Sequence, residues 1–148
     1  MKIFNKNAPS SYAIIEKIES GIVLLGSEVK AIKEGHADLS GSYVKILGSE
    51  AYLVNTKVFP YKYARAEGYQ EDRTRKLLLH KKEILVLKGR LTQANYTIIP
   101  LSIYIHNGII KLELALARGR KTYEKKRVLK ERDLQREAEQ DLKNMGKM

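Results

Sequence analysis

The stretch YTIIPLSIYIHNGIIKLELAL, residues 96–116, carries the strongest fold signal in the chain. Two apolar runs, at 96–105 and 109–116, lie on either side of Asn107-Gly108. An Asn-Gly pair between such runs is typical of a tight type I′ turn, because both residues tolerate positive φ. The stretch therefore predicts an antiparallel β-hairpin.

Further strands are predicted on the N-terminal side of this hairpin. Apolar, β-branched runs at 12–18 and 22–25 are separated by the Ser-Gly pair at 20–21, where we expect a tight turn. A second hairpin is predicted over 42–54, because the Gly-Ser pair at 48–49 suits a type II′ turn.

Two helices are predicted between the strands. Ser27 is placed to cap a short helix over 28–33, and Gly35 is placed to end it. A longer helix is predicted over 81–93, where large aliphatic residues recur at a spacing that fits one buried face. The residues of that face are Ile84, Leu87 and Leu91.

Five or more short strands with two or three short helices predict a mainly β domain. An OB-like antiparallel β-barrel is the first candidate, because such barrels close their sheet edges and present a face and loops to nucleic acid. A ubiquitin-like or other α+β roll is the alternative, and periodicity alone does not separate the two. We expect this domain to span residues 1–117 and to be followed by a tail at 118–148.

Positive charge dominates the chain and its tail. The 148 residues include 28 Lys and Arg against 17 Asp and Glu, and residues 118–148 hold 11 against 6. Such an excess favours a polyanionic partner, for which RNA, DNA and an anionic membrane all qualify. The tail lacks the wide apolar face that a membrane-surface helix needs. We therefore expect it to be ordered by something large and anionic rather than by the barrel.

Several kinds of chemistry have no sequence signal. The chain has no cysteine, and its three histidines are far apart, so no metal site is predicted. Gly-rich phosphate loops and the Gly-x-Ser-x-Gly motif do not occur, so we predict no cofactor and a binding protein rather than an enzyme. The sequence has neither a membrane-spanning run nor a secretory signal. A cytoplasmic monomer is expected.

The polar segment 60–75 is long for a loop in a compact domain. Its tyrosines alternate with basic residues, a combination that suits stacking on unpaired bases beside phosphate contacts. Equally, the tyrosines can pack against the barrel and the arginines can be solvated. For the basic cluster at its C-terminal end, phosphate contact is favoured. The tyrosines are Tyr61, Tyr63 and Tyr69, and the cluster is Arg73, Arg75 and Lys76.

Six motifs, in order along nearly the whole chain, match the pattern of one known family. They are Asn5-Lys6-x-Ala8 followed by Tyr12; Gly26-Ser27-Glu28-Val29-Lys30; Gly35-x-Ala37-x-Leu39 leading to Ser42-Tyr43-Val44; Arg73-x-Arg75-Lys76-Leu77-Leu78-Leu79-His80-Lys81; Gly119-Arg120-Lys121-x-Tyr123-Glu124-Lys125; and Lys130-Glu131-Arg132. With them the chain resembles the small protein B (SsrA-binding protein) family.

The resemblance implies an RNA-binding ribosome-rescue factor that acts in trans-translation. An OB-like barrel would hold the tRNA-like domain of transfer-messenger RNA. The tail, disordered when free, would become helical in the decoding centre and empty mRNA channel of the ribosome. A generic OB-type RNA binder or an initiation-like factor remains the alternative function.

The resemblance also assigns residues. The implied RNA-binding residues are Glu19, Lys30, Arg73, Arg75, Lys76, Leu78 and His80. The implied ribosome-binding tail residues are Gly119, Arg120, Lys121, Tyr123, Glu124, Lys125, Lys126, Lys130 and Arg132. For three of the RNA-binding residues the sequence leaves a structural reading open: a solvated strand end for Glu19, core for Leu78, and a helix N-terminal position for His80.

The chain departs from the family pattern in three places. Pro9-Ser10-Ser11 stands where a basic residue and His are common, and Gln70-Glu71 replaces the usual Asp-Pro. In the tail, Glu124 replaces Asp and Lys126 replaces Arg, which keeps the charge but loses the forked contacts of a guanidinium.

Overall fold

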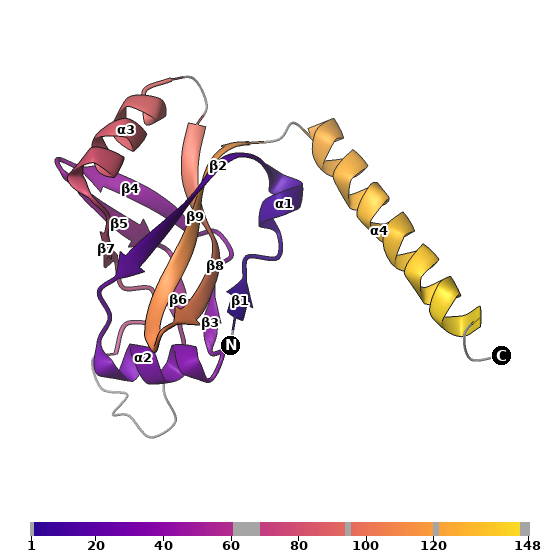
Figure 1. The fold of residues 1–148 in the computed structure, drawn as a ribbon, viewed down its shortest axis with the longest axis horizontal. Helices are drawn as coiled ribbons and strands as arrows, with labels where there is room; N and C mark the ends of the chain where they lie inside the picture. The colour runs from indigo at the N-terminus through magenta and orange to yellow at the C-terminus, as the bar shows by residue number, and fades with distance from the viewer. Residues whose placement is uncertain (1, 61–68, 94–95, 120–121, 146–148) are drawn as a thin grey trace.

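The computed structural model shows a β-barrel with helices at its two ends and one long helix projecting from it (Figure 1). It describes residues 2–60, 69–93, 96–119 and 122–145, and of 122–128 and 141–145 only the backbone. The described strands are β1 (Lys2–Phe4), β2 (Tyr12–Ile22), β3 (Ala37–Asp38), β4 (Tyr43–Leu47), β5 (Glu50–Val54), β6 (Lys57–Val58), β7 (Arg75–Leu78), β8 (Tyr96–His106) and β9 (Ile109–Gly119). The described helices are α1 (Ala8–Ser11), α2 (Gly26–Lys33), α3 (Lys81–Leu91) and α4 (Thr122–Met145).

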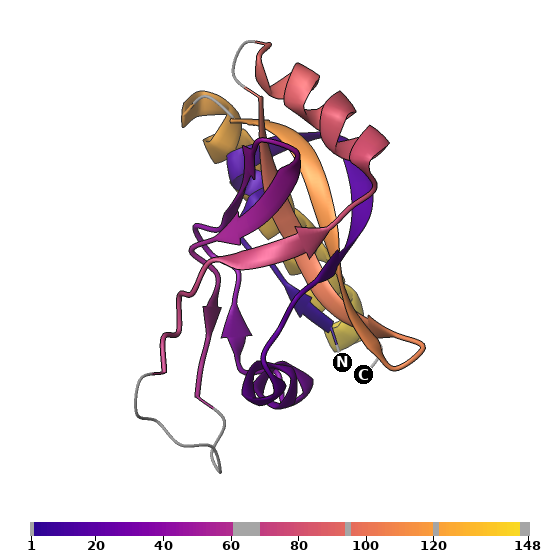
Figure 2. The same ribbon diagram turned by 90° about the vertical axis from the view of Figure 1, so that its left-hand side faces the viewer.

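The main sheet closes on itself. Neighbours pair antiparallel in the order β8-β4-β5-β7-β2-β9, and β9 pairs again with β8, which completes a ring (Figure 2). β1 adds to the edge of β8, and β3 and β6 form a separate two-stranded sheet. The mainly β, antiparallel prediction is confirmed, and the closed ring favours the barrel over an open α+β roll.

The predicted hairpins are confirmed. In the β8–β9 hairpin Asn107 has φ of 51° and Gly108 has φ of 76°, the two positive values that a type I′ turn requires. In the β4–β5 hairpin Gly48 has φ of 63°, as the first turn residue of a type II′ turn requires.

The predicted turn at residues 20–21 is wrong, because β2 runs without a break through both residues. Gly21 is paired with Lys111 of β9 on one side and with Leu78 of β7 on the other. These two sets of ladder pairs hold the Ser-Gly pair in a strand despite its local turn preference.

Gly21 has a different reason to be glycine. A Cβ atom at Gly21 would lie 3.1 Å from the Cβ of Leu78. The missing side chain therefore makes room for Leu78 to lie across β2, a close approach that glycine permits.

Helix α2 begins one residue before the predicted cap. The backbone N–H of Leu25 donates to Oε1 of Glu28 at 2.8 Å, so Glu28 and not Ser27 satisfies the helix start. Gly35 follows the helix with φ of 80°, as predicted for its end. In α3, which ends at Leu91 rather than at residue 93, Ile84 and Leu87 are buried as predicted.

An ion pair with no exposed charge connects α2 to β7. Glu28 is 1% exposed and Arg75 is 0% exposed. Oε2 of Glu28 accepts from the Arg75 guanidinium at 2.5 Å, and Oε1 accepts from Arg73 at 2.6 Å. The remaining N–H groups of Arg75 donate to the carbonyl oxygens of Thr56, Arg73 and Glu71. The pair is thus surrounded by hydrogen bonds, the condition under which a buried charge is tolerated.

We predict that Glu28→Gln destabilises the barrel by about 3–5 kcal/mol, because it leaves the buried Arg75 charge without its counter-ion. The matched control is Glu50→Gln, which breaks an exposed pair with Lys76 and should cost about 1 kcal/mol or less. Urea denaturation measures both. Equal losses in the two variants would contradict the assigned importance of the buried pair.

The same variant has an expected pH dependence. Burial alone would raise the pKa of Glu28, but hydrogen bonds from Arg73, the Leu25 N–H and Arg75 lower it below the model-peptide value of 4.5. The stabilisation by Glu28 is therefore present above that value and is lost as pH falls through the lower pKa of the folded state. The stability difference between wild type and Glu28→Gln should shrink in acid, as melting curves at several pH values would measure.

Candidate nucleic-acid interface

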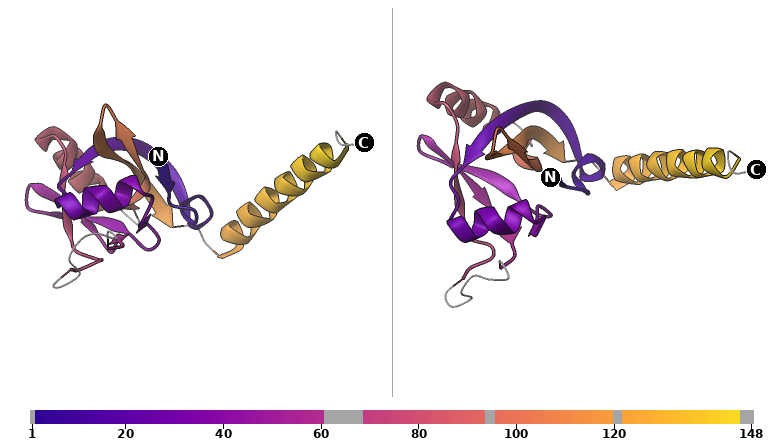
Figure 3. Two further views of the ribbon diagram at one scale, coloured as in Figure 1. Left: turned by 90° about the horizontal axis from the view of Figure 1, so that it is seen from below. Right: turned by 60° about the horizontal axis from the view of Figure 1, so that its bottom comes forward.

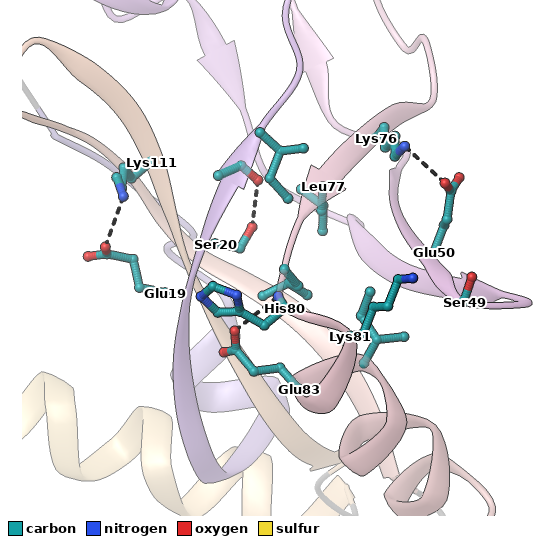
Figure 4. Close-up of a pocket in the computed structure, with 14 residues that line it drawn as sticks. Glu19, Ser20, Ser49, Glu50, Lys76, Leu77, His80, Lys81, Glu83 and Lys111 are labelled. Atoms are coloured by element: carbon teal, nitrogen blue, oxygen red, sulfur yellow. Dashed lines mark hydrogen bonds and ion pairs between the residues drawn. The ribbon is translucent and has the colours of Figure 1, made fainter.

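A pocket opens on the barrel surface where β7 leads into α3 (Figure 4). Its walls come from β2, the β4–β5 turn, β7, the first turn of α3, and β9. Four of the predicted RNA-binding residues line it together, although up to 61 positions separate them in the chain. They are Glu19, Lys76, Leu78 and His80.

Leu78 lies on the outer surface of the barrel. Side chains alternate along β7, so that Leu77 is 2% exposed whereas Leu78 is 54% exposed. The reading of Leu78 as a core residue is therefore wrong. Leu78 lies over Gly21 and presents an exposed apolar surface inside the pocket, whose lining mixes charged and aliphatic side chains.

The Glu19 carboxylate is fixed by neighbouring side chains, so Glu19 is not a freely solvated residue at a strand end. Its Oε2 accepts a short hydrogen bond from the Tyr104 hydroxyl, and its Oε1 lies 3.4 Å from Nζ of Lys111. The Tyr104 hydrogen bond has the largest effect and lowers the pKa of Glu19; burial opposes it, and Lys111 and His106 lower the pKa further. Partial burial and the same carboxylate raise the pKa of Tyr104 to about 12. Glu19 is thus ionised at neutral pH and Tyr104 keeps its proton.

His80 combines the two roles that the sequence left open. Its backbone N–H donates to Oε1 of Glu83 at 3.1 Å, and its carbonyl accepts from the Ile84 N–H at 3.1 Å, so the residue starts α3. Its side chain is exposed and lines the pocket near Glu83 (Figure 4). The cap is made by the main chain of His80 and the side chain of Glu83, and the exposed imidazole faces the pocket.

The other wall of the pocket carries a salt-bridged lysine. Nζ of Lys76 lies 3.0 Å from Oε1 of Glu50, and the Tyr52 hydroxyl donates to Oε2 of Glu50 at 2.7 Å. Hydrogen bonding and charge from Glu50 raise the pKa of Lys76, which is therefore a cation at any physiological pH.

The structure corrects the prediction for Arg75. Its fully buried guanidinium is used by Glu28 and by main-chain carbonyls, so it is not available for phosphate contact. Arg73 is partly exposed but also pairs with Glu28, and Lys30 lies on α2, at the opposite end of the barrel from α3 (Figure 1). Neither of these two lines the pocket, and their contact with RNA stays a prediction.

Two residues of the pocket environment were missed from the sequence, namely Tyr104 and Lys111. They are cross-strand partners either side of the Asn-Gly turn, so the predicted hairpin already placed them opposite each other. Their approach to Glu19 depends on the pairing of β9 with β2, which no local pattern indicates.

The loop after β6 is partly described. The Tyr69 hydroxyl donates to the carbonyl of Val58 at 2.7 Å, so this tyrosine is held against β6 of the two-stranded sheet. Tyr61 and Tyr63 lie outside the described residues. The carbonyl of Glu71 accepts hydrogen bonds from the Val58 N–H and from the Arg75 guanidinium, so the main chain of Glu71 is held at β6 and β7. The Pro9-Ser10-Ser11 segment, which departs from the family pattern, lies in α1, and the Ser10 hydroxyl donates to the carbonyl of Asn7.

The tail is helical in the structure and extends away from the barrel (Figure 3). Gly119 ends β9 opposite Tyr12, and a Cβ there would meet no atom within 4 Å. Lys130 is exposed and Arg132 is partly exposed. The predicted contacts of the other tail residues fall on side chains outside the description, and disorder of the free tail stays a prediction. Those residues are Arg120, Lys121, Tyr123, Glu124, Lys125 and Lys126.

Across the described ranges, none of the helices combines the length and the apolar content that crossing a bilayer would require.

Comparison with known proteins covers almost the entire chain. Residues 2–144 match the SmpB family model, described as "SmpB protein". An SsrA-binding protein of Sulfurihydrogenibium sp. (strain YO3AOP1) is 49% identical over 144 residues, which cover 97% of this chain and 95% of that protein. An SsrA-binding protein of Aquifex aeolicus (strain VF5) is 46% identical over 140 residues, which cover 94% and 89%.

A solved structure agrees with these sequence matches. The structure described as "tmRNA-SmpB: a journey to the center of the bacterial ribosome" superposes with a TM-score of 0.69 and 39% sequence identity, and the match covers 82% of this chain and 85% of that one. Because the family model and close relatives span nearly all of its residues, this chain belongs to the SmpB family.

Proposed function

We propose that this chain binds the tRNA-like domain of transfer-messenger RNA and delivers it to stalled ribosomes in trans-translation. The pocket between β2, β7, β9 and α3 carries the proposal, because it gathers Glu19, Leu78 and His80 from distant parts of the chain. Family membership and the net charge of +11 support it. The protein acts by binding and positioning RNA rather than by catalysing a reaction.

The pocket combines three kinds of contact that suit a folded RNA with unpaired bases. The Glu19 carboxylate accepts hydrogen bonds from base edges, and the exposed Leu78 side chain covers the face of a base. Lys76 and Lys81 supply cations for the phosphates around them. A groove that only followed a single strand would need neither a fixed carboxylate nor an apolar centre.

The tail is proposed to act separately from the barrel, in the decoding centre and the empty mRNA channel of the ribosome. The proposed contact residues are Gly119, Arg120, Lys121, Tyr123, Glu124, Lys125, Lys126, Lys130 and Arg132. Phosphates of the ribosomal RNA pair with the cations, and Tyr123 stacks on an exposed base, a contact worth about 1–3 kcal/mol. The division into a barrel and a tail follows from the charge and hydropathy of residues 118–148.

A generic RNA-binding function is distinguished by the RNA that the protein carries. The untagged protein should co-purify with one dominant RNA that has a tRNA-like end. A broad mixture of RNAs would contradict the proposal and favour a sequence-tolerant OB-type binder.

Leu78→Ala should weaken binding of the tRNA-like RNA by about 1.5–3 kcal/mol, the scale of burying a leucine side chain against a base. Because Leu78 is exposed, the melting temperature of the Leu78→Ala protein should stay close to that of wild type. The matched control is Leu85→Ala on the outer face of α3, which removes another exposed leucine, one that lies outside the pocket. Filter binding and thermal melting measure the two effects. Unchanged RNA affinity in Leu78→Ala would remove Leu78 from the interface.

A chain truncated after Gly119 should keep its affinity for the tRNA-like RNA and lose alanine transfer on stalled ribosomes. The cut follows Gly119 because β9 still pairs with β2 up to that residue. Binding by the truncated chain should weaken steeply with added salt, because phosphate contacts release counterions. A reconstituted peptidyl-transfer assay on ribosomes with an empty decoding site measures the second effect. Wild-type transfer by the truncated chain would show that the tail is dispensable.

A triple variant tests the tail without removing it. Tyr123→Ala with Lys125→Ala and Lys126→Ala should reproduce the loss of transfer at unchanged RNA affinity, because both the stacking and the cationic contacts are absent. Loss of RNA affinity in this variant would contradict the proposed separation of the two activities.

A further inference from the structure

Two donors on neighbouring strands fix the Glu19 carboxylate. Tyr104 of β8 donates to Oε2, and Lys111 of β9 lies 3.4 Å from Oε1. Tyr104 and Lys111 are directly opposite each other in the β8–β9 ladder, and Lys111 is opposite Gly21, two residues along β2 from Glu19. Both donors are therefore anchored to the barrel, and the plane of the carboxylate is set before any ligand arrives.

The held carboxylate keeps acceptor capacity on both oxygens. An ionised carboxylate has about four lone-pair positions. Tyr104 uses one on Oε2 and Lys111 uses one on Oε1, which leaves one on each oxygen. The side chain is 52% exposed and lines the pocket, so these two remaining positions are open to a ligand. They present a ligand with two adjacent hydrogen-bond acceptors and with no hydrogen-bond donor.

Only one standard base offers the matching pair. Guanine has two adjacent donors on its Watson–Crick edge, N1–H and the N2 amino group. Adenine and cytosine present one amino group next to an acceptor nitrogen, and uracil presents one N–H between two carbonyls. An acceptor opposite a carboxylate oxygen is repelled by it, so the other three bases make at most one of the two hydrogen bonds.

We propose that Glu19 recognises an unpaired guanine of the bound RNA through its Watson–Crick edge, with Tyr104 and Lys111 as positioning residues. The inference rests on the proposed RNA-binding function and names the base that this pocket selects. The base has to be unpaired, because pairing would occupy the same edge. Leu78, exposed in the same pocket, covers the face of a base whose edge reaches Glu19.

Tyr104 matters in this arrangement because the last torsion of a glutamate side chain is broad. Without the tyrosine hydroxyl, the carboxylate rotates and turns both oxygens toward Lys111. The two free acceptors then no longer face the ligand together. Tyr104→Phe is thus expected to reduce the preference for guanine while the ring continues to pack beneath Lys2 of β1.

Inosine substitution tests the proposal, because inosine keeps N1–H and lacks the N2 amino group of guanosine. The tRNA-like domain is transcribed with phosphorothioate-tagged inosine at a low level, and molecules that bind the full-length protein are separated from those that do not. With wild type, inosine should be depleted from the bound fraction at an unpaired guanosine. The same RNA with inosine at that one position should bind about tenfold more weakly, the scale of one lost base contact.

Three variants make the test specific. With Glu19→Gln the guanosine and inosine RNAs should bind equally, because an amide presents one acceptor oxygen beside a donor NH2 group and so cannot accept from both guanine donors side by side. With Tyr104→Phe the ratio of the two affinities should fall toward one at an unchanged melting temperature, and Lys111→Met should act in the same direction. The matched control is Glu113→Gln: Glu113 is the cross-strand partner of Glu19, pairs with Lys17 and lies outside the pocket lining, so its ratio should equal that of wild type.

The outcomes separate this inference from the function on which it rests. If the RNA binds tightly but inosine weakens binding at no unpaired guanosine in a way that depends on Glu19, the guanine assignment is overturned. The proposed function then still stands. Failure of wild type to bind the tRNA-like RNA overturns both. Equal weakening of the guanosine and inosine RNAs by Tyr104→Phe and by Lys111→Met overturns the positioning role.

Discussion

The pairing of β9 along both of its edges is the constraint on which the rest of the structure depends. β9 is hydrogen-bonded to β8 on one side and to β2 on the other, and these ladders close the barrel. Closure determines the site as well as the fold, because it brings Lys111 of β9 and Tyr104 of β8 to Glu19 of β2. The short β2–β7 ladder then carries Leu78 to the same place. The pocket is therefore a product of strand register, and a slip of one residue would turn Glu19 to the other face.

Local signals in the sequence were sufficient for the parts of the fold that are local. The Asn107-Gly108 and Gly48-Ser49 turns, and the buried face of α3, follow from residue preferences that act within a few positions. The prediction of a turn at residues 20–21 was wrong, because the local sequence of a Ser-Gly pair does not indicate whether other strands will pair on both sides of it. Gly21 is explained by Leu78, a residue 57 positions away, and only the assembled sheet reveals that contact.

The candidate site was predictable from family motifs more than from chemistry. Glu19, Leu78 and His80 each had an ordinary structural explanation in the sequence, and only their convergence in one pocket favours a binding role. Arg75 shows the opposite case. A basic residue in a basic stretch suggests a phosphate contact. Side chains alternate between the two faces of β7, however, and Arg75 points inward to Glu28. Sequence charge alone does not separate an arginine that binds a ligand from one that holds the fold.

The length of α4 has a mechanical consequence. At 1.5 Å per residue, the 24 residues from Thr122 to Met145 form a rod of about 36 Å. In a rigid helix, a residue near the far end has a fixed distance from a residue near the start and a fixed angle to it about the helix axis. Each inserted or deleted residue would shift the far end by about 1.5 Å and turn it by about 100°. As long as this helix is formed, exchanging one side chain leaves the positions of all the others unchanged, whereas inserting or deleting one residue displaces and rotates every residue beyond it.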